Sequence, residues 1–457
     1  MTSTIKVNTI TTESGSTLTV GGCGKTVALA SGASQTGFGR SGSVDWQTTP
    51  KTTTFTAASG EGYFINSGSS ITANLPAGSA GAIVAFSDYA RNFATYPFII
   101  APNGSEKIGG VADTLQLDVN GQAITLVYVD STKGWVNVQN AEDTETGTPA
   151  AFITATGGTI TTVCTNFKVH TFTGPGTFCV SCAGNSKGSD KVSYLVVAGG
   201  GEGGSTAPSN GGGGGGAGGY REAKNPDGGY TASPIASTCG LAVTGAIPIT
   251  VGAGGAQQPN PSNNLGNSGS NSIFSTITSA GGGGGKIDSP AGEPGTAGDG
   301  GSGGGGSAAS AASRNAGGSG NTPPTNPAQG TDGGTGGPNS DGVHGGGGGG
   351  GATGVGGNVN PGNNAGTGGV GATTNITGSP VAYAGGGGAA ATGGGAPARG
   401  AASPCGTGGQ GGSFPNLDGS AGTTNRGGGG GSGGWPAAGT ARGAGGSGIV
   451  IIRYKFQ

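Results

Sequence analysis

The residues best spaced to bind a phosphate-bearing cofactor are three glycines after a hydrophobic stretch. Residues 195–204 read Leu-Val-Val-Ala-Gly-Gly-Gly-Glu-Gly-Gly, in which Gly199, Gly201 and Gly204 match GxGxxG and Glu222 follows. In a dinucleotide-binding fold this loop must lead into a helix whose N-terminus binds the pyrophosphate. Here a Ser/Thr/Pro/Asn stretch and six further glycines follow, a composition that does not form a helix. The match therefore predicts no nucleotide site.

A second stretch resembles the end of a phosphate-binding loop. Residues 21–26 read Gly-Gly-Cys-Gly-Lys-Thr, but Thr19 stands where the first glycine belongs. No long strand or helix flanks the stretch. We favour a turn between two short strands.

The six cysteines contain one CxxC pair, Cys179 and Cys182. No second pair follows at metal-ligand spacing, and in a strand pattern residues three apart point to opposite faces. Zinc binding is therefore not predicted. Separate thiols are favoured, with a disulfide such as Cys164 to Cys182 as the alternative.

The two histidines lie far apart and accompany no nucleophile pattern. His170 falls in an alternating strand pattern, which indicates a structural role, and His344 lies among glycines. Acidic pairs such as Glu142 with Asp143 occur only in loop-like stretches. We therefore predict no catalytic residues, no metal and no other cofactor, and a protein that is not an enzyme.

Glycine runs fill the chain between about residues 198 and 448, and a hydrophobic stretch lies on each side of them. These stretches are residues 191–198 (KVSYLVVA) and 448–455 (GIVIIRYK). A disordered linker needs no matched strands at its ends, so we interpret the region as one folded unit. The longest runs are residues 211–216, 281–285, 303–306, 345–351, 385–388 and 427–431.

Glycine needs an unusual source of stability, because it has no side chain to bury. Ordering its backbone costs about 1–2 kcal/mol per residue. Close backbone packing, with each N–H bonded to a carbonyl of a neighbouring segment, can offset that cost. Extended left-handed helices with three residues per turn allow such packing, and the absence of strict Gly-X-Y spacing excludes collagen. We expect a bundle of polyglycine-II helices, with a disordered linker as the alternative.

Composition and charge exclude several partners. The 457 residues include 113 glycines, and only 32% are hydrophobic and 9% charged, too few for one conventional core. The net charge of −2, without a block of Lys or Arg, argues against nucleic acid. The first residues lack the apolar run of a signal peptide, and no stretch approaches the ~20 apolar residues of a membrane span. We expect cytoplasmic synthesis and no membrane insertion.

The chain divides into four predicted segments in a mostly β fold. Residues 1–40 contain few apolar residues, spaced for short strands, and need partners in an oligomer. Residues 41–140 form a small β-domain, residues 141–150 a linker, and residues 151–457 a β-framed glycine-rich domain. Predicted strands are 52–57, 62–65, 82–86, 98–100, 123–129, 135–138, 168–173, 176–180, 192–198, 246–251 and 271–277. Predicted loops between glycine helices are 208–210, 260–264, 321–326 and 358–364.

Short phrases follow one another in a characteristic order. They are residues 5–10 (IKVNTI), 29–33, 37–40, 44–47 (VDWQ), 60–63, 74–78, 103–108, 194–201 (YLVVAGGG), 249–255, 278–285 and 448–454. Together they resemble the tail-fibre and adhesin proteins of tailed bacteriophages, especially phages of marine bacteria and cyanobacteria. The likeness covers most of the chain. A similar arrangement of glycine helices occurs in some animal receptor kinases, so the order of the phrases is the specific part.

The resemblance implies an elongated homotrimeric fibre of the virion. Its N-terminal segment would attach to a tail or capsid protein, and its glycine-rich domain would present loops to a bacterial surface glycan or outer-membrane protein. Residues beside glycine-rich or turn-rich sequence are the candidates for receptor contact, since flat rings cover a sugar face at low entropic cost. The alternative is that these rings cap the bundle or seal a trimer contact. The candidates are Tyr220, Arg221, Tyr230, Tyr383, Phe414 and Trp435.

Three other functions compete with receptor binding. A purely structural fibre decorating the capsid or tail would form the same oligomer without binding cells. A polysaccharide-cleaving enzyme needs two carboxylates roughly 5–10 Å apart in a groove, and the sequence offers no convincing pair. An ice-binding protein needs flat Thr or Ala faces, which the irregular Asn/Pro-rich segments disfavour.

Overall fold

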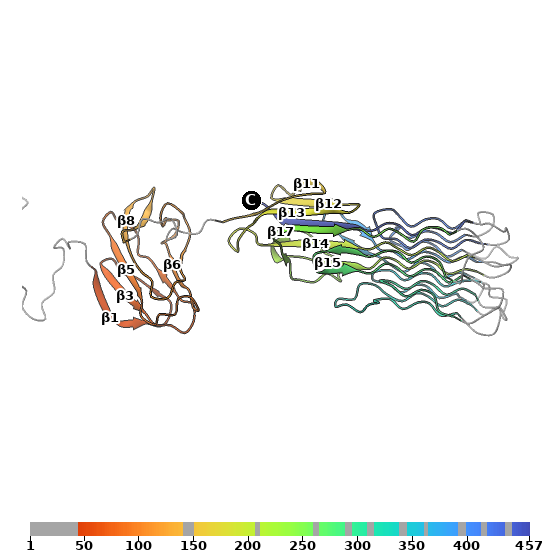
Figure 1. The fold of residues 1–457 in the computed structure, drawn as a ribbon, viewed down its shortest axis with the longest axis horizontal. Helices are drawn as coiled ribbons and strands as arrows, with labels where there is room; N and C mark the ends of the chain where they lie inside the picture. The colour runs from red at the N-terminus through yellow and green to blue at the C-terminus, as the bar shows by residue number, and fades with distance from the viewer. Residues whose placement is uncertain are drawn as a thin grey trace, which may run out of the picture. The chain divides into compact units, whose positions relative to one another are not determined.

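The computed structural model describes most of the chain after residue 43 (Figure 1). The chain forms two compact units, residues 1–149 and 150–457. The described parts are rich in β-strands and contain no α-helix, as the sequence predicts. None of their elements is a helix able to cross a membrane. Described residues are 44–139, 150–205, 211–258, 265–287, 295–308, 315–337, 345–360, 364–391, 399–412, 418–434 and 441–457.

The first unit contains two facing sheets. Its strands alternate between the sheets up to β6, and the pairs β1–β3, β3–β5, β2–β4 and β4–β6 run parallel. One sheet has the order β1 (Asp45–Lys51), β3 (Glu61–Ile65), β5 (Ile83–Asp88), β8 (Ala123–Asp130), β9 (Gly134–Asn137). The other has the order β2 (Phe55–Thr56), β4 (Thr72–Asn74), β6 (Phe98–Ala101), β7 (Leu115–Leu117).

Aromatic and aliphatic side chains fill the space between these two sheets. Phe86 of β5 and Phe98 of β6 come from opposite sheets, and their ring centroids lie 5.2 Å apart. Val84, Phe86 and Ile100 are completely buried because alternate strand residues point inward. The predicted strands of this unit are confirmed, although 52–57 shortens to β2 and three further strands were not predicted.

The second unit begins with two antiparallel sheets packed face to face. The first has the order β10 (Ile153–Thr156), β13 (Gly176–Ala183), β17 (Gly245–Thr250), β18 (Ser272–Phe274), β19 (Ile277–Ser279). The second has the order β11 (Thr159–Val163), β12 (Phe167–Phe172), β22 (Ile449–Lys455), β14 (Lys191–Val197), β15 (Tyr220–Ala223), and the short β16 (Leu241–Ala242) also pairs with β14. β20 (Ala372–Thr374) and β21 (Val381–Tyr383) form a separate two-stranded antiparallel sheet.

The hydrophobic stretches on either side of the glycine region are the two central strands of the second sheet. β14 and β22 pair antiparallel, with Val197 opposite Ile449 and Ser193 opposite Arg453. Val196 and Ile452 face the first sheet, whereas alternate residues of both strands face a second cluster on the other side. Burial on both faces explains why these strands read as continuous apolar runs.

Beyond the strands, extended glycine runs lie side by side (Figure 1). In the run 213–219 the backbone donors rotate among three neighbouring runs, with N···O distances of 2.8–3.1 Å. Every third donor therefore reaches the same neighbour. Gly213, Gly216 and Gly219 donate to Lys286, Gly283 and Ala280; Gly214 and Ala217 donate to Gly347 and Gly350; Gly215 and Gly218 donate to Gly430 and Gly427.

The runs approach so closely that a side chain has no space. A Cβ atom added to Gly215 would lie 2.2 Å from the carbonyl oxygen of Gly201. One added to Gly349 would lie 1.9 Å from the oxygen of Gly215. Glycine is required here by backbone contact and not by an unusual φ angle.

Candidate functional site

Three of the candidate aromatic residues gather around one buried carboxylate. Glu222 of β15 is only 4% exposed and accepts three hydrogen bonds. The Tyr220 hydroxyl donates to Oε2 at 2.5 Å, the Thr374 hydroxyl to Oε1 at 2.6 Å, and the Ser233 backbone N–H to Oε2 at 3.0 Å. Tyr230 and Tyr383 belong to the same buried cluster. The cluster joins β15 to the β20–β21 hairpin.

Burial determines the protonation of these phenols. It raises the pKa of Tyr220 well above its usual value, and the Glu222 carboxylate raises it further. The pKa of Tyr230 is raised by the same two causes, burial first. Tyr220 therefore stays neutral at physiological pH, as the donor to Glu222 must.

Arg453 of β22 fastens the same region from the sheet side. Its Nε donates to the carbonyl oxygen of Gly228 at 2.9 Å, Nη2 to that of Gly229 at 3.0 Å, and Nη1 to that of Ile376 at 3.1 Å. The guanidinium also lies 4.3 Å from the ring centroid of Phe167. One buried side chain thus holds both the 3-10 turn η2 (Pro226–Gly228) and the loop of the hairpin.

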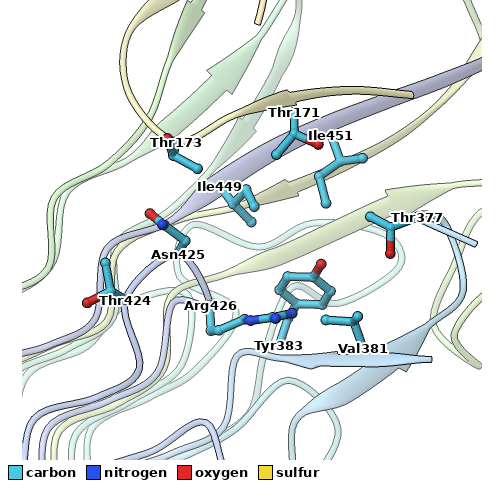
Figure 2. Close-up of a pocket in the computed structure, with 10 residues that line it drawn as sticks. All are labelled: Thr171, Thr173, Thr377, Val381, Tyr383, Thr424, Asn425, Arg426, Ile449 and Ile451. Atoms are coloured by element: carbon cyan, nitrogen blue, oxygen red, sulfur yellow. The ribbon is translucent and has the colours of Figure 1, made fainter. Parts of the chain in front are cut away.

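A polar pocket of about 320 Å³ opens beside this cluster, where the strands meet the glycine runs. β22 contributes its floor, because Ile449 and Ile451 are alternate residues on one strand face. Figure 2 shows the Tyr383 phenol pointing into the pocket and the Arg426 side chain running along its ring. The lining residues are Thr171, Thr173, Thr377, Val381, Tyr383, Thr424, Asn425, Arg426, Ile449 and Ile451.

Arg426 and Tyr383 are fixed to each other at this pocket. The guanidinium carbon lies 4.8 Å from the ring centroid, and the Arg426 carbonyl accepts the Ala384 N–H at 2.8 Å. Ala384 and Asn425 both adopt left-handed backbone, with φ of 56° and 58°. Such conformations are unfavourable for alanine and gather where the fold holds a local geometry. Arg426 was not among the candidates named from the sequence. The sequence feature that could have indicated a site is a positively charged residue between the turn residues Asn425 and Gly427.

The other end of the glycine runs forms a second candidate region. Described residues on either side of a gap are bonded to one another there: Gly204 donates to the oxygen of Gly213, Gly337 to that of Gly345, and Asn360 to that of Asn364. In Figure 1 the described runs end together on the side away from the strands. We call this end the distal end. The chain therefore leaves and rejoins the described runs repeatedly at one face of the unit.

A buried ion pair joins the run that contains Glu202 to the run that contains Arg442. Arg442 Nε and Glu202 Oε1 lie 3.6 Å apart, and both side chains are almost completely buried. Glu202 also accepts the backbone N–H groups of Gln258 and Asn267, each at 2.8 Å. Burial lowers the pKa of Arg442, and the Glu202 carboxylate opposes that shift.

The structure corrects the expectation that the aromatic candidates lie on loops. Tyr220 and Arg221 belong to β15 and Tyr383 belongs to β21, and the exposed fractions of the two tyrosines are only 1% and 2%. Tyr230 is also buried, and the three rings belong to one buried cluster. Arg221 is half-buried. Phe414 and Trp435 lie outside the described residues.

The GxGxxG glycines and His170 are packed against other parts of the fold. Gly199, Gly201 and Gly204 pack against neighbouring backbones, with carbonyl oxygens 2.0–2.2 Å from any added Cβ, which leaves no room for a pyrophosphate. His170 is buried, with Nδ1 2.7 Å from the Gly157 oxygen and Nε2 3.0 Å from the Tyr454 hydroxyl. Residues 21–26 and His344 lie outside the described residues.

The cysteine alternative of a disulfide is wrong for the pair that was considered. Cys164 and Cys182 are both free and exposed, as is Cys179. Within the described ranges, no three His, Cys, Asp or Glu side chains are grouped to hold a metal ion.

Comparison with known proteins identifies the second unit. A family model described as a glycine-rich domain matches residues 171–455, which is more than half of the chain. The match runs from β12 to β22 and so includes the strands as well as the glycine runs. A search of curated proteins finds no match.

Proposed function

Since this chain belongs to the glycine-rich domain family, we propose that it is a bacteriophage fibre protein that binds a receptor on its host. The glycine-rich unit acts as a rigid scaffold, and segments at its distal end contact a bacterial surface glycan or outer-membrane protein. The observation that carries the proposal is that the described runs end together at one end of a hydrogen-bonded bundle. Loops on a rigid scaffold are a common arrangement for binding.

The scaffold is, in this proposal, a bundle of polyglycine-II helices. The period of three in the backbone donors of residues 213–219 supports it, because a helix with three residues per turn directs successive N–H groups to three neighbours. The contacts of Gly215 support it too, because only hydrogen atoms fit between the runs. Such a lattice satisfies backbone groups without a hydrophobic core.

Two segments outside the described residues have a composition that fits recognition. Residues 413–417 read Ser-Phe-Pro-Asn-Leu and residues 435–440 read Trp-Pro-Ala-Ala-Gly-Thr. Along the chain, Phe414 falls between the described residues 399–412 and 418–434, and Trp435 falls between 418–434 and 441–457. These two aromatics remain our receptor-contact candidates, since rings with few rotatable bonds lose little entropy on binding.

The remaining parts of the proposal concern assembly. The N-terminal segment attaches to a tail or capsid protein, and three chains form the fibre within the virion. Light scattering on the purified chain tests the trimer, which predicts three times the chain mass of 42.5 kDa. A mass equal to one chain contradicts it.

Cell binding tests the function directly. The labelled full chain is titrated onto a panel of marine cyanobacterial and other bacterial strains, with mutants lacking surface glycan or single outer-membrane proteins. The proposal predicts saturable, strain-selective binding that one receptor class abolishes. If the folded protein does not bind a strain that adsorbs the parent particle, a purely structural fibre is the better account.

A further inference from the structure

We propose that the pocket between β22 and the β20–β21 hairpin binds a carboxylated sugar ring, a uronic acid residue. This inference does not depend on the fibre proposal, because it rests on the pocket alone. The pocket is lined by residues of β12, β21 and β22 and by the turn residues 424–426 that precede a glycine run. Its lining combines one cation, several hydroxyl groups and an aliphatic floor.

The charge of the pocket selects an anion. Among the ten described lining residues, Arg426 alone is charged. Its guanidinium is half-buried and held 4.8 Å from the Tyr383 ring centroid, so the planar fork is already oriented. A planar carboxylate matches that fork with two parallel hydrogen bonds. A doubly charged phosphate is a poorer match for a single cation.

Polar groups around Arg426 suit the hydroxyls of a sugar. Thr173, Thr377 and Thr424 each present a hydroxyl that can donate and accept. The Ser447 hydroxyl donates to Asn425 Oδ1 at 3.0 Å, which leaves the two amide hydrogens of Asn425 to donate. These groups come from three separate parts of the chain, so one ring can meet several of them at once.

The floor of the pocket suits the apolar face of the same ring. Ile449 and Ile451 of β22 and Val381 of β21 line the pocket, and in Figure 2 Ile451 lies beside Thr171 while Val381 lies beside Tyr383. A pyranose has C–H groups on its faces and hydroxyls around its edge, which corresponds to this arrangement. The volume of about 320 Å³ is at the small end of ligand pockets, about 300–1,000 Å³, and fits one sugar unit.

Binding is measured on the full chain by saturation-transfer-difference NMR with three probes. Methyl β-glucuronide carries the ring and the carboxylate, methyl β-glucoside carries only the ring, and acetate carries only the carboxylate. The proposal predicts that the glucuronide binds at least tenfold more tightly than either of the others. Glucoside or acetate binding within threefold of the glucuronide overturns the proposal, as does the absence of glucuronide binding.

Variants at Arg426 assign that binding to the pocket. Arg426→Gln removes the charge and should weaken glucuronide binding at least tenfold, whereas Arg426→Lys keeps the charge without the fork and should fall between. Arg221→Gln is the matched control, because it removes one positive charge from β15 outside the pocket. Unchanged affinity in Arg426→Gln, or an equal loss in Arg221→Gln, contradicts the assignment.

A second variant keeps the test decisive if Arg426→Gln fails to fold. Thr424 is exposed on the pocket rim, so Thr424→Val removes one hydroxyl without touching the core. It should weaken the glucuronide about threefold and leave acetate unchanged. If Thr424→Val binds the glucuronide with parental affinity, the Thr424 hydroxyl does not contact the sugar, and the proposed sugar contact is overturned. The cell-binding assay is separate, because it depends on the distal end.

Discussion

Val197, the last residue of β14, lies opposite Ile449, the first residue of β22, in an antiparallel pair. The chain therefore enters and leaves the glycine region through two neighbouring strands at the centre of one sheet. Both ends of a long, side-chain-poor region are thereby fixed by conventional hydrophobic burial, since Val197 and Ile449 belong to one buried cluster. The two paired strands thus hold the first and last residues of the glycine region side by side.

The glycine lattice should not tolerate a methyl group at its centre. Gly215→Ala would place Cβ 2.2 Å from a backbone oxygen, so the runs would have to separate and lose hydrogen bonds. We expect a destabilisation of about 3 kcal/mol or more, and a melting temperature lower by about 5 °C. Differential scanning calorimetry measures it.

Gly174→Ala is the matched control for that change. A Cβ at Gly174 meets no atom within 4 Å, so this variant should be neutral or slightly more stable. Equal melting temperatures for the Gly215 and Gly174 variants would show that the runs do not pack as described.

The Glu222 cluster should require a carboxylate. The Glu222 carboxylate accepts three hydrogen bonds. In Glu222→Gln one carboxylate oxygen becomes an NH2 group, which cannot accept and would face a hydrogen-bond donor. Because the site is buried, we expect a loss of about 1–3 kcal/mol in the free energy of unfolding. Asp190→Asn is the control, an exposed acid of the same unit. Chemical denaturation that gives equal stabilities for the two variants would contradict the role of Glu222.

His170 predicts a pH dependence of stability. Burial is the main cause that lowers its folded pKa below the ordinary value of 6.5. As pH falls, the unfolded chain therefore takes up the proton first, and stability present above about pH 6.5 decreases towards the folded pKa. The slope is at most about 1.4 kcal/mol per pH unit.

Thermal unfolding between pH 7.5 and 5.5 checks this slope. His170→Gln should flatten the pH dependence even if it lowers stability at every pH. His344→Gln is the comparison, because it removes the protein's other imidazole. A parental slope in His170→Gln would exclude His170 as its source.

Strands could be predicted where their burial requires a recognisable pattern of apolar residues in the sequence. The stretches that became β14 and β22 are apolar on both faces, so their sequence alone marked them as strands around the glycine region. β15 was not predicted, because its four residues (Tyr-Arg-Glu-Ala) follow a glycine run directly and form no run of apolar residues. Tyr220 therefore read as part of a loop, although pairing with β14 makes it a buried strand residue.

The pocket was beyond sequence reasoning for a different reason. Thr171 lies on β12 and Arg426 on a turn far along the chain. The pairing of β12 with β22, together with hydrogen bonds from Asn425 and Gly427 to Ser447 just before β22, brings them to one cavity. Glycine runs carry no side-chain pattern from which their neighbours can be read. The backbone N–H groups of residues 213–219 donate to three different runs. Which runs are neighbours in space cannot be read from the sequence.

The most direct test of receptor recognition at the distal end compares cell binding by two matched variants. In one, Phe414 and Trp435 are both replaced by serine; in the other, Tyr89, a 61% exposed ring of the first unit, is replaced by serine. Affinity is measured on a strain that binds the parent chain, for proteins with the parental melting temperature. We predict at least a tenfold loss for the variant at Phe414 and Trp435 and parental binding for Tyr89→Ser. Parental binding by the variant at Phe414 and Trp435 would contradict the account.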